Sequence, residues 1–259
     1  MDGRLAARGV GPLVEQLRAL GVRPGGVLLV HTSYRAVRPV EGGPAGLIDA
    51  LCAALTPGGT LVMPSWSDDD DAPFDPARSP VARDLGVVAE TFRRLPGVRR
   101  SDHPFAFAAL GPRAETVLAD PLPLPPHIPA SPVGRVHDLD GQILLLGVNH
   151  DADTTLHLAE VISGVPYRIP KHCTVVRDGR PVQLEYAEND HCCERFTLAD
   201  EWLRAADVQR EGKVGHADAR LARSRDIVRI AGAHLNADPL VFLHEAGACP
   251  ECDRARAHI

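Results

Sequence analysis

The sequence predicts an α/β fold in which an open central sheet is flanked by helices. Two short apolar runs, Thr60–Pro64 and Gly141–Val148, lie between turn residues, a pattern typical of strands buried on both faces of a sheet. Segments with apolar residues at helical spacing separate such runs. This strand–helix–strand order predicts parallel strands joined by right-handed crossovers.

The N-terminal half alternates predicted helices and strands. Gly21 is a suitable C-terminal cap for the first helix, and Pro44 suits the first turn of the second. In chain order we expect a helix at Leu13–Leu20, a strand at Val27–Val30, a helix at Ala45–Leu55, a strand at Thr60–Pro64, a helix at Val87–Leu95 and a strand at Phe105–Leu110.

The C-terminal half begins with a proline-rich segment, Pro121–Pro132, whose six prolines predict an extended covering loop. After the strand at Gly141–Val148, the oxygens of Asp153, Thr154 and Thr155 can cap the next helix. We then expect a hairpin of Cys173–Arg177 and Val182–Tyr186 around Asp178-Gly179, mainly helix from Leu198 to Leu235, and a strand at Leu240–Leu243 before a tail with cysteines.

Length and charge narrow the class of protein. A chain of 259 residues with 44% apolar content predicts a single domain, residues 1–259, in which 165–259 could form a smaller substrate-binding lobe. The net charge of −6 and the lack of a basic stripe argue against a nucleic-acid partner. Without a membrane-length apolar run or a signal segment, we expect a cytoplasmic protein without membrane contact, either a monomer or a homodimer.

His157 and Glu160 form the first candidate site. They are three residues apart on the helix predicted after Gly141–Val148, so they share one face of it. That position lies just past the carboxyl end of a central strand, where open α/β sheets bind ligands. A core histidine beside a surface carboxylate is the alternative interpretation.

Five collinear stretches carry a family resemblance: Leu28–Ser33, Gly58–Ser67, Arg100–Gly111, Ala130–Val136 and Thr154–Glu160. As an ordered set they resemble the aminoglycoside 3-N-acetyltransferase family, also called the antibiotic N-acetyltransferases. Three further motifs, Pro-Pro-His-Ile-Pro-Ala-Ser-Pro, Asp-His-Cys-Cys-Glu-Arg-Phe and Cys-Pro-Glu-Cys, most resemble its subclass acting on gentamicin, tobramycin and apramycin.

The resemblance implies acetyl transfer from acetyl-CoA to the 3-amino group of the 2-deoxystreptamine ring, and hence antibiotic resistance. It also implies a fold distinct from the common N-acetyltransferases, whose pyrophosphate-binding Arg/Gln-x-x-Gly-x-Gly/Ala turn the sequence lacks. Two alternatives stay open. One is a metal-dependent hydrolase using His31, His103 and His157, although no H-x-H or H-E-x-x-H spacing organises them. The other is a non-catalytic aminoglycoside-binding protein.

The transfer requires a proton acceptor, because a protonated amine has no lone pair to attack a thioester. A histidine near its usual pKa of about 6.5 suits that task. By resemblance His157 is this base, and Glu160 is placed to fix its tautomer and stabilise the imidazolium. Glu188 and Asp190 remain alternatives for the same role.

The resemblance also implies where the two substrates bind. Acetyl-CoA is expected to bind at the stretch that follows the first strand and at the Arg-Ser-x-His-Pro motif, with Arg35 near the CoA phosphates. For His103, a structural hydrogen bond before Pro104 is the stronger expectation. The expected cosubstrate-binding residues are His31, Thr32, Ser33, Tyr34, Arg35, Val37, Ser101 and His103. A polycationic antibiotic needs carboxylates in a cleft, and the candidates are Asp68, Asp151, Glu188 and Asp190.

The cysteines predict a structural zinc site. Cys249-Pro-Glu-Cys252 is a C-x-x-C knuckle, and His191 and Cys193 alternate in an extended chain, so all four side chains could meet one metal while Cys192 points away. Free thiols are the alternative. Since no cysteine accompanies the His157 motif in sequence, we expect direct transfer in a ternary complex without an acetylated enzyme.

Overall fold

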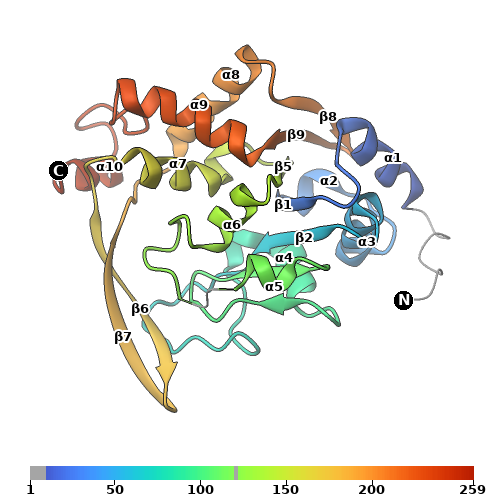
Figure 1. Ribbon diagram of the computed structural model, residues 1–259, viewed down its shortest axis with the longest axis horizontal. Coiled ribbons are helices and arrows are strands. Elements are labelled where there is room, and N and C mark those ends of the chain that lie inside the picture. The colour runs from blue at the N-terminus through green and yellow to red at the C-terminus, as the bar shows by residue number, and fades with distance from the viewer. Residues whose placement is uncertain (1–9, 120–121) are drawn as a thin grey trace.

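The computed structural model describes residues 10–119 and 122–259, which form a seven-stranded central sheet (Figure 1). The strand order is β3-β4-β2-β1-β5-β9-β8. In the middle, β1 pairs in parallel with both β2 and β5, whereas the outer strands pair antiparallel. The strands are β1 Val27–Thr32, β2 Thr60–Pro64, β3 Arg99–Arg100, β4 Phe107–Leu110, β5 Gln142–Leu146, β8 Arg210–Val214 and β9 Ala217–Arg223. The predicted α/β fold with an open central sheet is confirmed.

Helices cover both faces of the sheet, so the molecule has three layers (Figure 1). Alternate residues of β1 divide between two cores: Leu28 and Val30 pack on the side of α1, α3 and α4, and Val27 and Leu29 on the side of α6, α7 and α9. The helices are α1 Gly11–Leu20, α2 Tyr34–Val37, α3 Gly43–Leu55, α4 Gly86–Arg93, α5 Ala114–Val117, α6 Pro132–Asp138, α7 Thr155–Ser163, α8 Leu198–Ala205, α9 Ser224–Ala237 and α10 Pro250–Arg256. In the described part of the chain, short 3-10 turns lie at Arg83–Leu85, His150–Ala152 and Glu194–Thr197.

Local signals in the sequence set several of these boundaries. Gly21 ends α1 in the left-handed conformation, with φ 109°, and its N–H bonds back to the last turn. A proline occupies the first turn of α3, as expected. Pro121, at the start of the predicted proline-rich loop, lies outside the described residues; at the loop's end the Ser131 hydroxyl caps α6 by accepting the Gly134 N–H at 3.3 Å.

The predicted hairpin is confirmed and is longer than expected. Strands β6 (Ile169–Arg177) and β7 (Arg180–Glu188) form a separate two-stranded ribbon that extends away from the body (Figure 1). Asp178 and Gly179 both have positive φ, 51° and 73°, which matches the right-handed twist of the two strands.

Two predictions for the C-terminal region are wrong. Leu198–Leu235 is not mainly helical, because β8 and β9 lie between α8 and α9, and β9 pairs antiparallel with β5. β8 is a polar edge strand with four exposed residues, so it carries no apolar pattern to detect. Leu240–Leu243 is a turn, and Phe242 and Leu243 are buried in the core as side chains without joining the sheet. Residues 165–259 therefore supply two strands of the central sheet as well as the hairpin.

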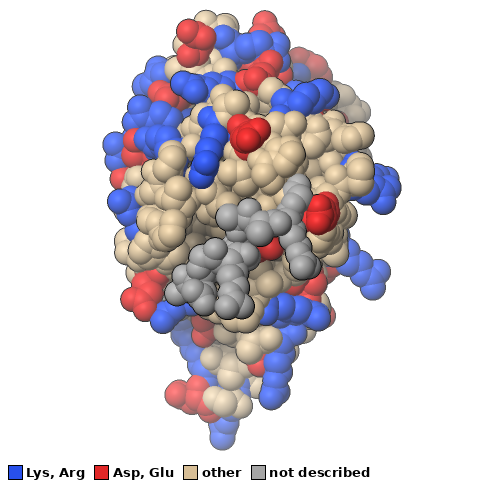
Figure 2. Space-filling model, turned by 90° about the vertical axis from the view of Figure 1, so that its right-hand side faces the viewer, with Lys and Arg blue, Asp and Glu red and all other residues tan. Residues whose placement is uncertain are grey.

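Two surface properties bear on the expected partners. Among the described residues, no helix combines the length and apolar character needed to cross a membrane. On the face shown in Figure 2, basic and acidic side chains are interspersed toward the edges.

Candidate active site

The carboxyl ends of β1, β2 and β5 open into a cleft of about 240 Å³. β1 is the switch point of the sheet, because the chain crosses from β1 to β2 on one side while β5 lies on the other. Ligands bind at such points in open α/β sheets. The end of β1, the segment after β5 and helix α7 supply six polar residues to the lining: His31, Thr32, Asp151, Asp153, Thr154 and His157. Asp84, His127 and Cys193 line it from other segments.

The start of α7 is held in place by Asp153. Its Oδ1 accepts the Thr155 N–H at 2.9 Å, and its Oδ2 lies 3.1 Å from Nδ1 of His150. Asp153 is buried, so its carboxylate serves the helix start and that histidine. Of the three predicted capping residues, Asp153 alone bonds to the helix start in the described part of the chain, whereas the Thr154 and Thr155 hydroxyls do not cap the helix. Asp153 thus helps to determine where the next turn of α7 projects His157.

His157 and Glu160 lie against one another, as their spacing predicts. His157 Nδ1 is 2.8 Å from Glu160 Oε2, and Glu160 is fully buried. A carboxylate at this distance accepts the Nδ1–H, which leaves the lone pair on Nε2. Neither Glu188 nor Asp190, the alternatives for this position, bonds to His157 in the described part of the chain.

Glu160 is the centre of a buried polar network. Its Oε1 accepts hydrogen bonds from the Tyr167 hydroxyl and from His191 Nε2, the latter at 2.8 Å. Burial raises the pKa of Glu160, but His191 and His157 outweigh burial and lower it to about 2. The carboxylate is therefore ionised at neutral pH, and its three donors fix its position.

Cys193 contacts the other side of the His157 ring. Its Sγ lies 3.4 Å from His157 Nε2, so a cysteine that is distant in sequence is a neighbour of this histidine in space. Cys193 has φ 60°, a left-handed conformation that is uncommon for a residue other than glycine and that sets the direction of the thiol. Burial lowers the pKa of His157, yet Cys193 and Glu160 outweigh burial and raise it well above 6.5.

Aromatic rings surround the imidazole of His157. The His127 ring stacks on it, with centroids 4.8 Å apart and planes at 24°, and Phe196 meets it edge-on at 4.9 Å. Burial lowers the pKa of His127 well below 6.5, so this ring is neutral. Sequence reasoning missed His127 as a site residue, although it lies in the Pro-Pro-His-Ile-Pro-Ala-Ser-Pro motif that indicated the subclass.

Only some of the predicted cosubstrate residues lie in the cleft lining. His31 and Thr32 are there, and His31 Nε2 lies 3.3 Å from Thr154 Oγ1; burial lowers the pKa of His31 to about 4. Ser33, Tyr34 and Arg35 follow at the start of α2, beyond that lining.

Three further predicted cosubstrate residues have buried side chains. The Val37 side chain is packed in the core. Ser101 Oγ accepts the Phe107 N–H at 3.0 Å, and His103 Nδ1 accepts the Phe105 N–H at 2.7 Å. The side chains of Ser101 and His103 are buried and shape the chain before β4, which confirms the structural hydrogen bond expected for His103.

The predicted antibiotic-binding carboxylates lie in different surroundings. Asp151 is exposed and lines the cleft, as does Asp84, which sequence reasoning missed. Asp68 Oδ2 instead accepts the Arg83 N–H at 3.0 Å. Asp190 lies 2.6 Å from the Lys171 ammonium. Burial raises the pKa of Glu188 to about 7.

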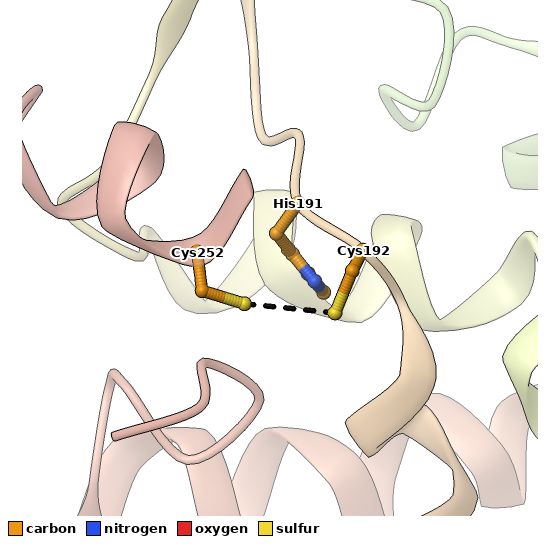
Figure 3. Close-up of side chains that lie close together, drawn as sticks. All are labelled: His191, Cys192 and Cys252. Atoms are coloured by element: carbon orange, nitrogen blue, oxygen red, sulfur yellow. Dashed lines mark hydrogen bonds between the residues drawn. The ribbon is translucent and has the colours of Figure 1, made fainter. Parts of the chain in front are cut away.

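The predicted zinc ligands do not come together as expected. Cys193 faces His157, and it is Cys192 that points toward the tail, with its Sγ 3.6 Å from Cys252 Sγ (Figure 3). His191 uses both ring nitrogens in hydrogen bonds, Nε2 with Glu160 and Nδ1 as acceptor of the Cys193 N–H. The strict alternation assumed for an extended chain fails because the backbone turns at Cys193. The histidines considered for a hydrolytic metal, His31, His103 and His157, do not cluster in the described residues.

Comparison with known proteins identifies close relatives. Residues 29–236 match the family described as "Aminoglycoside 3-N-acetyltransferase". The chain is 68% identical over 232 residues to aminoglycoside N(3)-acetyltransferase IV of a Salmonella species, covering 90% of this chain and 89% of the relative. It is 34% identical over 245 residues to the type III enzyme of Pseudomonas aeruginosa, with 85% and 90% covered.

Solved structures give the same result. The crystal structure of the aminoglycoside acetyltransferase AAC(3)-IVa apoenzyme superposes with a TM-score of 0.95 at 64% identity over all of both chains. A histidine-to-alanine variant of that enzyme was solved in complex with a gentamicin (TM-score 0.94, 67% identity, 95% and 96% covered). A more distant structure, AAC-IIIb, was solved with CoASH (TM-score 0.81, 27% identity, 89% and 97% covered).

Proposed function

The chain belongs to the aminoglycoside 3-N-acetyltransferase family, and on that premise we propose that acetyl-CoA is its acetyl donor and His157 its general base. The acetyl group goes to the 3-amino group of the 2-deoxystreptamine ring of antibiotics such as gentamicin and apramycin. One observation carries this proposal: His157 Nδ1 is held by the buried Glu160 at 2.8 Å while the ring lines the cleft.

The proton transfer follows from that geometry. With Nδ1–H donated to Glu160, Nε2 accepts a proton from the attacking amine as the bond to the acetyl carbonyl forms. The C–S bond of the thioester then breaks, and the leaving CoA thiolate takes up that proton to give CoASH. The imidazolium that results is stabilised by the Glu160 carboxylate. A positioned base of this kind contributes about 10²–10⁴-fold to the rate. His191 and Tyr167 act as positioning residues, because both donate to the same carboxylate.

The acetyl donor is assigned to the end of β1. His31 and Thr32 line the cleft there, and His31 is neutral at physiological pH because burial lowers its pKa to about 4. A neutral imidazole and a hydroxyl can hold a thioester by hydrogen bonds. Ser33, Tyr34 and Arg35 at the start of α2 extend this stretch toward solvent, where CoA phosphates bind. The relative solved with CoASH supports this class of cosubstrate, and a cytoplasmic location would supply it.

The antibiotic is assigned to the acidic part of the cleft. Asp84 and Asp151 line it, and each ammonium that leaves water requires a carboxylate partner. Glu188 and Asp190 are assigned to the outer part of the antibiotic. A bound ammonium would shift the raised pKa of Glu188 downward and make its carboxylate the charged partner.

The position of Cys193 makes an acetyl-cysteine intermediate the second candidate mechanism. His157 Nε2 is 3.4 Å from the thiol and can deprotonate it, as in cysteine–histidine pairs. Direct transfer remains our proposal, because it needs one acyl transfer and one proton acceptor where the covalent route needs two transfers. Acetyl-CoA alone would leave a stable acetyl group on Cys193 only in the covalent route.

Mass spectrometry of reaction products tests the function. Purified protein with acetyl-CoA and gentamicin or apramycin should yield a singly acetylated antibiotic, and NMR should locate the acetyl group at N3. Gentamicin that is already acetylated at N3 is the matched control and should gain nothing. The absence of product, or acetylation at another nitrogen, would refute the assignment.

A further inference from the structure

The C-terminal tail returns to the segment beside the active site at Cys192. The Sγ atoms of Cys192 and Cys252 point toward one another from two distant segments and lie 3.6 Å apart (Figure 3). A disulfide would require about 2.05 Å between the sulfur atoms. Thiolates bound to one zinc ion at about 2.3 Å lie about 3.8 Å apart at the corners of a tetrahedron. The observed separation therefore fits two ligands of one metal ion.

Cys249 is the candidate third thiol. It is the N-cap of α10, and Cys252 lies three residues later on the first turn of that helix. A C-x-x-C turn at the start of a helix can present both of its thiols to one metal ion, as zinc knuckles do.

His244 supplies a nitrogen. One of its ring nitrogens lies within 4.8 Å of the Cys192 sulfur and of a Glu194 carboxylate oxygen. His244 Nε2 is buried and makes no hydrogen bond among the described residues, although a Glu194 oxygen is 3.3 Å away. The Arg256 guanidinium donates to the His244 carbonyl, which fixes this loop against α10. A buried imidazole nitrogen without a hydrogen bond in the described part of the chain, close to the Cys192 thiol, has the chemistry of an additional metal ligand.

We propose that Cys192, His244, Cys249 and Cys252 bind one structural zinc ion as three thiolates and one imidazole. This set replaces two of the ligands expected from the sequence, because the His191 nitrogens and the Cys193 thiol are already directed at the active-site network. Binding releases the thiol protons, and the binding free energy becomes part of the folding free energy. The site does not depend on the proposed acetyl transfer.

The ion would connect the tail to the backbone that carries the catalytic network. Cys192 lies between His191, which donates to Glu160, and Cys193, which contacts His157. Zinc bound at Cys192 therefore holds α10 and the 191–193 turn together. Its loss should loosen the tail first and weaken the His191–Glu160 contact second.

Metal analysis of the full-length protein purified without added metal is the direct test. Elemental analysis should find one zinc ion per chain, and zinc-edge X-ray absorption should find three sulfur ligands and one nitrogen. The variants Cys252→Ser and His244→Ala should lower zinc content and melting temperature. The matched control Cys52→Ser, in the distant helix α3, should retain the full zinc content.

Two results would overturn the proposal. The first is that the purified protein contains no zinc, and that the thiols of Cys192, Cys249 and Cys252 either react freely after unfolding or include a disulfide between Cys192 and Cys252. The other is bound zinc whose content is unchanged in both variants. Because the native protein alone answers the first question, the test stands even if a variant fails to fold.

Discussion

Replacement of Glu160 by glutamine should destabilise the protein by about 3 kcal/mol at neutral pH. Glu160→Gln keeps the shape of the side chain and removes the charge on which His157, His191 and Tyr167 converge. The pKa of this fully buried carboxyl is lowered from 4.5 to about 2. At about 1.36 kcal/mol per pKa unit, that difference corresponds to about 3 kcal/mol.

The pH dependence gives the same prediction a second test. Because the pKa is lower in the folded state, the stabilisation by Glu160 is complete above pH 4.5 and is lost as the pH falls toward 2. Urea unfolding should therefore separate the parent and Glu160→Gln most at neutral pH, and the two should converge as the solution is acidified. The separation should persist in salt, since a buried pair is weakly screened.

An exposed carboxylate provides the control for this measurement. Glu15 lies on the solvent side of α1, and Glu15→Gln should change the free energy of unfolding by less than about 0.5 kcal/mol. If Glu160→Gln also stays within that margin at neutral pH, or keeps the parental acid sensitivity, the carboxylate does not stabilise the network as an ion.

Three further predictions concern catalysis. kcat/KM should rise with pH through a midpoint above 6.5, because the base must be deprotonated and the pKa of His157 is raised. Glu160→Gln should move this rise in the pH–rate profile to lower pH. A rise at the parental pH in that variant would contradict the assignment. Cys193→Ser should retain kcat within about 10-fold of the parent value if transfer is direct. The covalent route would be established by two results together: a loss of kcat as large as that from removing His157, and an acetyl group on Cys193 of the parent protein. Asp151→Asn should raise KM for gentamicin by about 10-fold with little change in kcat, because one desolvated charge pair contributes about 1.4 kcal/mol. Equal effects on neutral and cationic acceptors would contradict the role of Asp151 in binding an ammonium group.

Local patterns were enough to predict the part of the fold that forms the cleft. The buried strands β1, β2 and β5 carry unbroken apolar runs, and the spacing of His157 and Glu160 places them on one helical face. These features depend on neighbours within a few residues, where periodicity is informative.

The partners of Glu160 could not be predicted in the same way. Tyr167 is seven residues away beyond the end of α7, and His191 is thirty-one residues away across the hairpin. Cys193 reaches His157 only because the backbone turns with φ 60°, which an assumption of extended chain excludes. Packing between distant segments creates this network, and no short sequence window contains it.

The rate of acetyl transfer by His157→Ala tests the central claim most directly. With acetyl-CoA and gentamicin at saturation, kcat should fall by about 10²–10⁴-fold, while the dissociation constants of acetyl-CoA and gentamicin measured by calorimetry stay within a few-fold of the parent values. A kcat close to that of the parent protein would show that His157 is not the base. A loss of turnover accompanied by an equal loss of both binding affinities and a lower melting temperature would show that the histidine only supports the fold.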